Sequence, residues 1–217
     1  MDDLKLIAKP DLAVLAVSGP QALEQFPILK DLPETYQCIE HDGLVTINQS
    51  FTGEDGLLFI ADKEQWPQID LPVLSVEDQE VLRIEAGFVD QDQDINEKTL
   101  LPETNLQNQL VSYTKGCFVG QEIVARVKYR GSANKSLMGL IFDDAAPAKG
   151  AELSSRGKKA ASVKSSIHSP QIGKNIALAY LRKDYRVPGS RHAFETEDGQ
   201  VYKATVAQLP FYQHADN

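Results

Sequence analysis

Apolar residues fall into short blocks along this chain, and turn residues separate them. Residues 12–17 form a continuous apolar run, which is typical of a buried strand, and the turn Ser18-Gly19-Pro20 and a short helix at 21–26 follow. Further strands are predicted at 36–40, 44–48 and 57–61. The first two flank Asp42-Gly43, a pair that favours a hairpin turn.

Two longer helices are predicted downstream. Ser75 followed by Asp78 favours an N-cap, and a helix over 76–86 would end at Gly87, where a left-handed residue is needed. Residues 90–112 are polar and form a connecting segment. The second helix is expected over 120–129, with Ile123, Val124 and Val127 on its apolar side.

After the second helix the pattern changes to short strand-like runs between turn residues. This spacing predicts a small antiparallel barrel or sandwich. We therefore expect an α+β protein, with a mixed α/β domain over residues 1–131 and the small antiparallel barrel or sandwich over 132–217. The predicted strands of the second domain are residues 137–142, 152–153, 161–165, 176–181, 192–195 and 201–209.

Composition places the chain among ordinary globular proteins of the cytoplasm. Its 217 residues contain no apolar stretch long enough to cross a bilayer, and the start Met1-Asp2-Asp3 lacks the basic region of a secretory signal. The net charge of -9 is unevenly distributed, because residues 1–114 carry 22 acidic and 6 basic side chains and residues 115–217 carry 9 and 16.

The charge asymmetry has three explanations. The first is that the two parts attract each other, and the second is that the basic part meets an anionic partner such as RNA or a polyglutamylated ligand. The third is that the surface is simply solvated. Direct RNA binding is the weaker form of the second explanation, because no signature with paired aromatic residues is present.

The chain has only two cysteines, Cys38 and Cys117, and their spacing indicates neither a disulfide framework nor a metal site. Cys117 lies between Lys115 and the predicted start of a helix. Positive charge and the unpaired N–H groups of a helix's first turn both favour a thiolate, so Cys117 is a candidate reactive thiol. The alternative is that Cys117 is a small buried apolar side chain.

The run Lys115-Gly116-Cys117-Phe118-Val119-Gly120-Gln121-Glu122-Ile123-Val124-Ala125-Arg126 resembles the signature of the YgfZ-type folate-binding proteins. Three further stretches resemble both that family and its relative, the aminomethyltransferase (T-protein) of the glycine cleavage system. They are residues 51–56, the Arg-Ile-Glu-Ala-Gly stretch at 83–87, and the segments 169–180 and 209–212 taken together. The resemblance covers nearly the whole chain.

The resemblance implies a folate-binding α/β body followed by a C-terminal β-barrel, with tetrahydrofolate or a derivative as the cofactor. It implies that Glu85 and Arg83 are the cofactor-binding residues, and that the carboxylate of Glu85 binds the pterin. Such a carboxylate can accept two parallel hydrogen bonds from the ring. The alternative for Glu85 is an exposed helix charge paired with Arg83 or Lys98.

Members of this family carry a further N-terminal segment before the part that matches Leu12 here. In T-proteins that segment includes the aspartate used in aminomethyl transfer. We therefore do not carry this catalytic activity over from the resemblance.

The function implied is that of a folate-dependent accessory factor for iron-sulfur cluster assembly or repair, which indirectly supports tRNA modification. Its partners would be a reduced folate and iron-sulfur assembly proteins or cluster enzymes. Cys117 would be the functional thiol and Lys115 would keep it charged, with support from Gly116, Gly120, Gln121, Glu122 and Arg126. The alternatives are a folate-dependent aminomethyl or methyl transferase and a non-catalytic module that docks a partner.

Overall fold

The computed structural model describes residues 5, 7–131 and 133–212, and it divides into two compact units. Unit 1 takes the described residues up to Val76, and unit 2 takes those from Glu77 onward. Each unit has its own sheet and its own buried apolar cluster.

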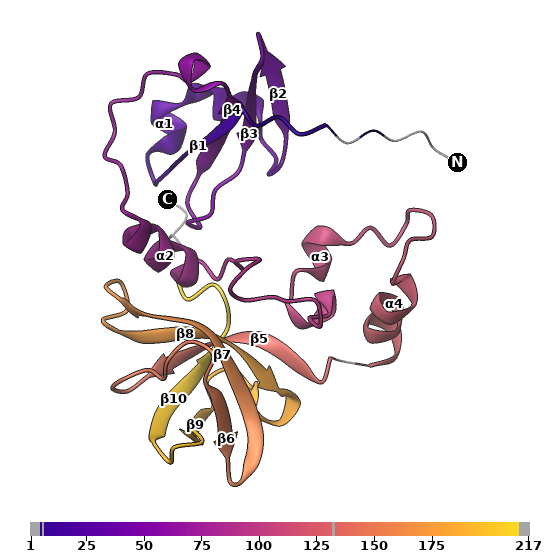
Figure 1. Ribbon diagram of the computed structural model, residues 1–217, viewed down its shortest axis with the longest axis vertical. Helices are drawn as coiled ribbons and strands as arrows, with labels where there is room; N and C mark the ends of the chain where they lie inside the picture. Colours follow the sequence, from indigo (N-terminus) through magenta and orange to yellow (C-terminus); the bar gives the residue numbers. More distant parts are fainter. Residues whose placement is uncertain (1–4, 6, 132, 213–217) are drawn as a thin grey trace. The chain divides into compact units, whose positions relative to one another are not determined.

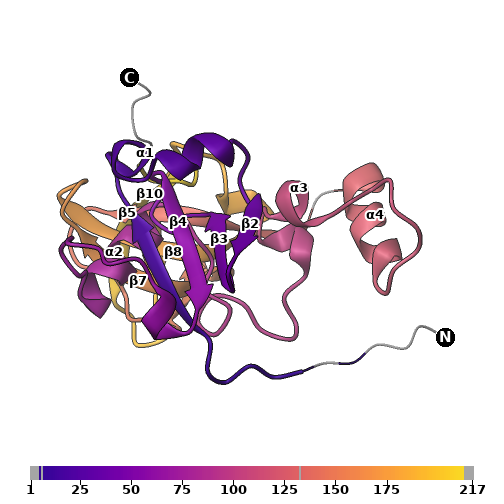
Figure 2. The ribbon, with the colours of Figure 1, turned by 90° about the horizontal axis from the view of Figure 1, so that it is seen from above.

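Unit 1 is a four-stranded antiparallel sheet with short helices. The strands lie side by side in the order β1-β4-β3-β2 (Figure 2). Asp42 and Gly43 join β2 to β3 with φ angles of 50° and 83°, which confirms the predicted hairpin turn. The elements are β1 (Ala13–Ser18), α1 (Ala22–Gln25), a 3₁₀ helix (Pro27–Asp31), β2 (Cys38–His41), β3 (Leu44–Asn48), β4 (Gly56–Ala61) and a second 3₁₀ helix (Lys63–Gln65).

The core of unit 1 lies on one face of this sheet. Leu57 and Phe59 of β4 are opposite Val17 and Leu15 of β1, so these four side chains share a face. Ala22 of α1 packs against the same cluster. The predicted strand-turn-helix opening is therefore confirmed, with the helix shorter than expected.

Unit 2 contains a closed six-stranded antiparallel barrel in the order β10-β5-β8-β7-β6-β9 (Figure 1). Its interior is a single apolar cluster to which all six strands contribute. The predicted antiparallel second domain and the α+β class are confirmed. The strands are β5 (Lys135–Phe142), β6 (Glu152–Ser155), β7 (Lys158–Ser169), β8 (Lys174–Arg182), β9 (Arg191–Glu195) and β10 (Val201–Ala207).

Strand β8 is buried on both faces. Ala177, Ala179 and Leu181 belong to the barrel interior. The alternate residues Ile176, Leu178 and Tyr180 pack outside the barrel against Ile84 of helix α2 (Val76–Glu85). Burial on both faces explains why residues 176–181 form a continuous apolar run instead of an alternating one.

The packing of α2 on the barrel places the division between compact units at residue 76, earlier than the predicted domain division at 131. Unit 2 therefore also holds the connecting segment and the second helix. That part contains a 3₁₀ helix (Leu101–Glu103), α3 (Gln107–Leu110) and α4 (Gln121–Arg130). Helix α4 agrees with the predicted helix to within one residue, whereas the two short helices were not predicted.

Candidate functional site

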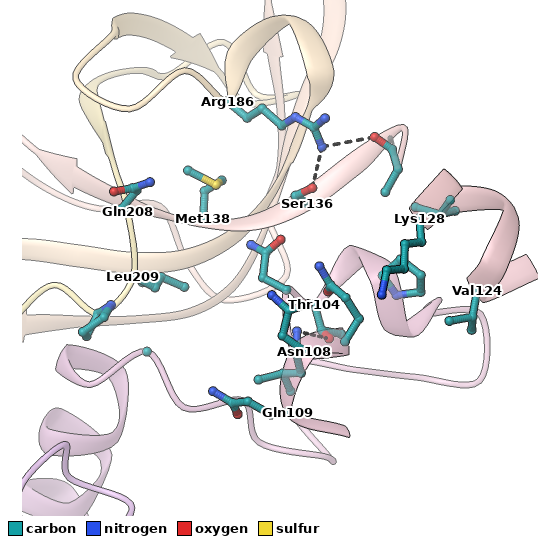
Figure 3. Close-up of a pocket in the computed structure, with 18 of the residues that line it drawn as sticks. Thr104, Asn108, Gln109, Val124, Lys128, Ser136, Met138, Arg186, Gln208 and Leu209 are labelled. Carbon is teal, nitrogen blue, oxygen red and sulfur yellow. Dashed lines mark hydrogen bonds between the residues drawn. The ribbon is translucent and has the colours of Figure 1, made fainter. Parts of the chain in front are cut away.

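A hollow of about 880 Å³ lies within unit 2 (Figure 3). It is bounded by the residues that follow α2, the segment that includes α3, helix α4, strand β5 and the segment after β10. None of the described residues that line it is a carboxylate, although the chain as a whole is acidic. Its polar lining residues are Thr104, Asn105, Gln107, Asn108, Gln109, Tyr113, Lys128, Ser136, Arg186 and Gln208.

Two cations approach the hollow from different elements. Arg186 donates from Nη1 to the carbonyl oxygen of Ala133 at 3.1 Å and to the Ser136 hydroxyl oxygen at 2.5 Å, which fixes the guanidinium beside β5 (Figure 3). Lys128 projects from α4, with its Nζ 3.2 Å from the centre of the Tyr113 ring. Among the described residues neither cation forms an ion pair with a carboxylate. The hollow therefore carries uncompensated positive charge.

Amide side chains of the segment around α3 supply the neutral part of the lining. Asn105 donates from Nδ2 to the Leu137 carbonyl oxygen at 2.7 Å, which ties the segment to β5. The Gln107 Oε1 atom is buried and has no hydrogen-bond partner within the part of the chain that the structure describes. A buried amide oxygen without a donor is costly, so this atom is a candidate acceptor for a ligand N–H group.

Glu85 ends helix α2, next to the hollow. Its side chain is buried, with 6% exposure, so it is not the exposed helix charge of the alternative interpretation. Ser169 donates its hydroxyl proton to Oε1, and the Glu85 carbonyl oxygen accepts the Phe211 N–H at 2.9 Å. The carboxylate forms no ion pair among the described residues. Ala86, the next residue, lines the hollow.

Arg83, two residues before Glu85 on α2, is held in a buried polar network. It donates from Nε and Nη2 to Glu80, from Nη1 to Asp94 at 2.6 Å and to the Phe88 carbonyl oxygen, and from Nη2 to the Ser165 hydroxyl. Burial opposes the charge of Arg83, but its bonds to Glu80 and the charge of Asp94 outweigh this and raise its pKa. These contacts use all five N–H donors of the guanidinium.

Cys117 lies in the loop before α4 and is a free, exposed thiol, so the alternative that it is a buried apolar residue is wrong. The Lys115 ammonium lies 4.9 Å from the centre of the Phe118 ring. In the sequence, Lys115 precedes Cys117 and Phe118 follows it. Gln121 accepts the Phe118 N–H at its Oε1, 3.3 Å away, which links the loop to the helix. The thiol is accessible, and a cationic side chain belongs to the same loop.

The remaining signature residues shape the loop and the start of α4. Gly120 precedes the helix with a φ angle of 87°, a left-handed conformation that favours glycine. Gly116 has open space where a Cβ would lie. Arg126 donates to Glu122 at 2.9 Å, but both side chains are mostly exposed, so this pair stabilises the helix by only about 0.3–0.5 kcal/mol.

The loop and Glu85 could be predicted from the sequence, but the two cations of the hollow could not. Lys128 and Arg186 are far apart in the sequence and belong to no recognisable spacing. The only signal was the excess of basic residues after position 114.

Comparison with known proteins defines the class of this fold. Residues 135–213 match the family described as the glycine cleavage T-protein C-terminal barrel domain. The structure resembles aminomethyltransferase T of the glycine cleavage system from Bartonella henselae, with a TM-score of 0.76 and 22% sequence identity over 93% of this chain and 60% of that one. The chain therefore has a T-protein-like fold.

Sequence relatives make the relation more specific. The chain is 32% identical over 224 residues to a probable aminomethyltransferase from Natronomonas pharaonis, covering 95% of this chain and 61% of that protein. It is also 32% identical over 157 residues to the tRNA-modifying protein YgfZ of Yersinia enterocolitica, covering 68% of this chain and 48% of that protein.

The chain is thus similar to both the YgfZ-type proteins and the aminomethyltransferases, as its signature predicted, and it spans about half to three fifths of these relatives. Within the described residues, no helix is both long and apolar enough to span a membrane.

Proposed function

We propose that this chain is a folate-dependent accessory factor for the assembly or repair of iron-sulfur clusters, and that it supports tRNA modification through enzymes that contain such clusters. The observation that carries the proposal is the exposed Cys117 thiol within the YgfZ signature. The match to a relative named as a tRNA-modifying protein YgfZ supports the same conclusion.

The residues around Glu85 fit a reduced folate. The Glu85 carboxylate is buried, and among the described residues it has one hydroxyl donor and no cationic partner. It can therefore accept further hydrogen bonds, and burying a carboxylate without them is costly. Ring N–H groups of a pterin are donors of the required kind. Glu85 would hold the pterin, and a reduced folate bound there supplies a carrier for one-carbon groups.

Arg83 has a supporting role in this proposal. Its donors are already occupied by Glu80, Asp94, Phe88 and Ser165, so it would position the end of α2 rather than contact the folate. Ser169 would orient the Glu85 carboxylate through its hydroxyl group.

Cys117 acts in this proposal as a transient thiolate ligand to cluster iron, with the cluster as the substrate. A lone thiolate suits transfer better than storage, because resident clusters are normally held by about four ligands. Gln121 would hold the loop that carries Lys115 and Cys117 against the start of α4.

The test compares the two exposed cysteines. Cys117→Ser should abolish the chain's support of a cluster-dependent tRNA-modifying enzyme in cells, whereas Cys38→Ser should leave that support intact, since both thiols are free and exposed but only one lies in the signature. In the purified protein, iodoacetamide should alkylate Cys117 faster than Cys38. Full enzyme activity with Cys117→Ser would end the thiol hypothesis.

A folate-dependent aminomethyl or methyl transferase is the second candidate. It is favoured by the breadth of the aminomethyltransferase match, which covers 95% of this chain against 68% for the YgfZ relative. This function requires that the purified protein consume a one-carbon folate with multiple turnovers. A complete lack of turnover by a folate-bound protein would exclude it.

A further inference from the structure

We propose that one end of the barrel binds the phosphate backbone of a nucleic acid, with transfer RNA as the partner that the proposed function supplies. Two segments form this end: residues 155–159, where β6 turns into β7, and residues 182–192, which lead from β8 into β9. Their four exposed, unpaired cations are called the basic rim: Arg156, Lys158, Arg182 and Lys183. None of the four lines the hollow or belongs to the YgfZ signature, so the basic rim is a surface of its own.

The charge of the two segments is opposite to that of the whole chain. They carry seven lysine and arginine side chains and one carboxylate, that of Asp184, although the net charge of the chain is -9. Three of these cations are already bound within unit 2: Lys159 and Arg191 form ion pairs, and Arg186 is bonded to Ala133 and Ser136. The basic rim has no ion pair among the described residues, so its four cations are available to an anionic partner.

Contacts between the two segments bring the basic rim to the same end of the barrel. Tyr185 donates from its hydroxyl group to the Ser155 carbonyl oxygen at 3.2 Å, and the turn at Arg156 follows directly. Strand β8, which ends at Arg182, is antiparallel to its neighbour β7, which begins at Lys158. The four cations are therefore mounted on one edge of a rigid closed sheet.

The turn between β6 and β7 contains an unusual residue. Ser155 is paired with Lys158, so Arg156 and Gly157 form a two-residue turn, and their φ angles of 53° and 72° are both left-handed. Such a turn favours asparagine, aspartate or glycine at its first position, because a longer side chain is less stable in this conformation. A long cation where stability favours asparagine points to a role beyond turn formation.

The makeup of this surface fits a nucleic acid better than an acidic protein. Protein interfaces have an apolar core and are depleted in lysine. Within the two described segments, Val187 is the only large apolar side chain that is mostly exposed. Surfaces that bind nucleic acids are much more positively charged, and arginine and lysine make many of their phosphate contacts.

Fluorescence anisotropy of a labelled, unmodified transfer RNA transcript, titrated with the full chain at increasing salt, tests the proposal. Four phosphate contacts predict a slope of about -3 to -4 for log affinity against log salt concentration, which weakens binding about a hundredfold between about 50 and 200 mM salt. Arg182→Gln and Lys183→Gln should each reduce the magnitude of the slope by about 1.

The matched control is Lys174→Gln. It removes an exposed cation at the opposite end of β8, roughly 26 Å along the strand from Arg182, and it should leave the slope unchanged. Arg156→Asn separates binding from stability, because asparagine suits the left-handed turn. This variant should bind transfer RNA more weakly while its thermal midpoint stays the same or rises.

Absence of binding, binding that does not depend on salt, or equal effects of Lys174→Gln and Arg182→Gln would overturn the inference. Competition by poly-L-glutamate as effective as that by unlabelled transfer RNA would overturn it in favour of an acidic protein. Duplex DNA with the same number of phosphates identifies the source: tighter binding of transfer RNA supports the proposal, and tighter binding of the DNA would overturn transfer RNA as the partner. Cys117→Ser should keep full RNA affinity, so failure of the thiol function and failure of the basic rim are distinguishable.

Discussion

Removing the Arg83 side-chain charge should destabilise unit 2 strongly. The Arg83 side chain is 12% exposed and that of its partner Asp94 is fully buried, so Arg83→Met would leave a buried carboxylate without its cation. Breaking a buried ion pair from one side costs about 3–5 kcal/mol. Ser165 and the Asp90 N–H still donate to Asp94, so we expect the lower part of this range.

Urea unfolding followed by far-ultraviolet circular dichroism measures this loss through the barrel strands. With a slope of about 2 kcal/mol per molar urea, a loss of about 3–4 kcal/mol lowers the midpoint by about 1.5–2 M. Trp66 is the only tryptophan and lies in unit 1, so its fluorescence gives a second signal that reports unit 1. That signal should shift far less.

The matched control is Arg126→Met, which removes the same side chain from an exposed ion pair on α4. Its cost should not exceed about 0.5 kcal/mol, a shift of at most about 0.25 M. If Arg83→Met shifts the midpoint no further than Arg126→Met, the buried network does not stabilise unit 2 as argued. The double variant Arg83→Met with Asp94→Asn should cost less than the sum of the single changes.

Two further predictions concern the barrel. Gly139→Ala should destabilise it by about 1–3 kcal/mol, because the new Cβ would lie 2.5 Å from the Phe211 ring and 3.2 Å from the Ala207 Cβ. Thermal unfolding measures this loss, and the control is Gly116→Ala, whose Cβ meets nothing within 4 Å. Equal losses of stability in the two variants would contradict the packing around Gly139. Burial, together with the nearby Arg156 charge, holds the pKa of His192 below its usual 6.5. As the pH falls, His192 is protonated in the unfolded chain before it is protonated in the folded one, so the free energy of unfolding should fall as the pH drops below about 6.5. Arg156→Gln should raise the His192 pKa in an NMR titration. An unchanged pKa would exclude the effect of the Arg156 charge.

Local sequence signals were enough to predict most strands of the fold. The barrel strands could be located because turn residues separate them and because each is short. Barrel closure could not be predicted, since it depends on β10 pairing with both β5 and β9, and either a sandwich or a barrel satisfies the same alternation. The packing of α2 on β8 was also not visible, because a continuous apolar run does not show what covers its second face.

The residues of the candidate site likewise fall into those that the sequence reveals and those that only the structure reveals. Cys117 and Glu85 belong to contiguous motifs, so the sequence identified both. Lys128 and Arg186 come together only through the placement of α4 and of the segment after β8, which is a property of tertiary packing. Likewise, nothing in the sequence distinguishes Gln107 from neighbouring amides, because its buried Oε1 becomes visible only in three dimensions.

The two cysteines are free and exposed, and they lie in different units, Cys38 on β2 of unit 1 and Cys117 before α4 of unit 2. The natural chain therefore carries one attachment point for a spectroscopic label in each unit, and no cysteine needs to be introduced. Spin labels on both thiols would turn the separation between the units into a measurable distance distribution. A change in that distribution on adding tetrahydrofolate would report ligand binding directly as movement of one unit relative to the other.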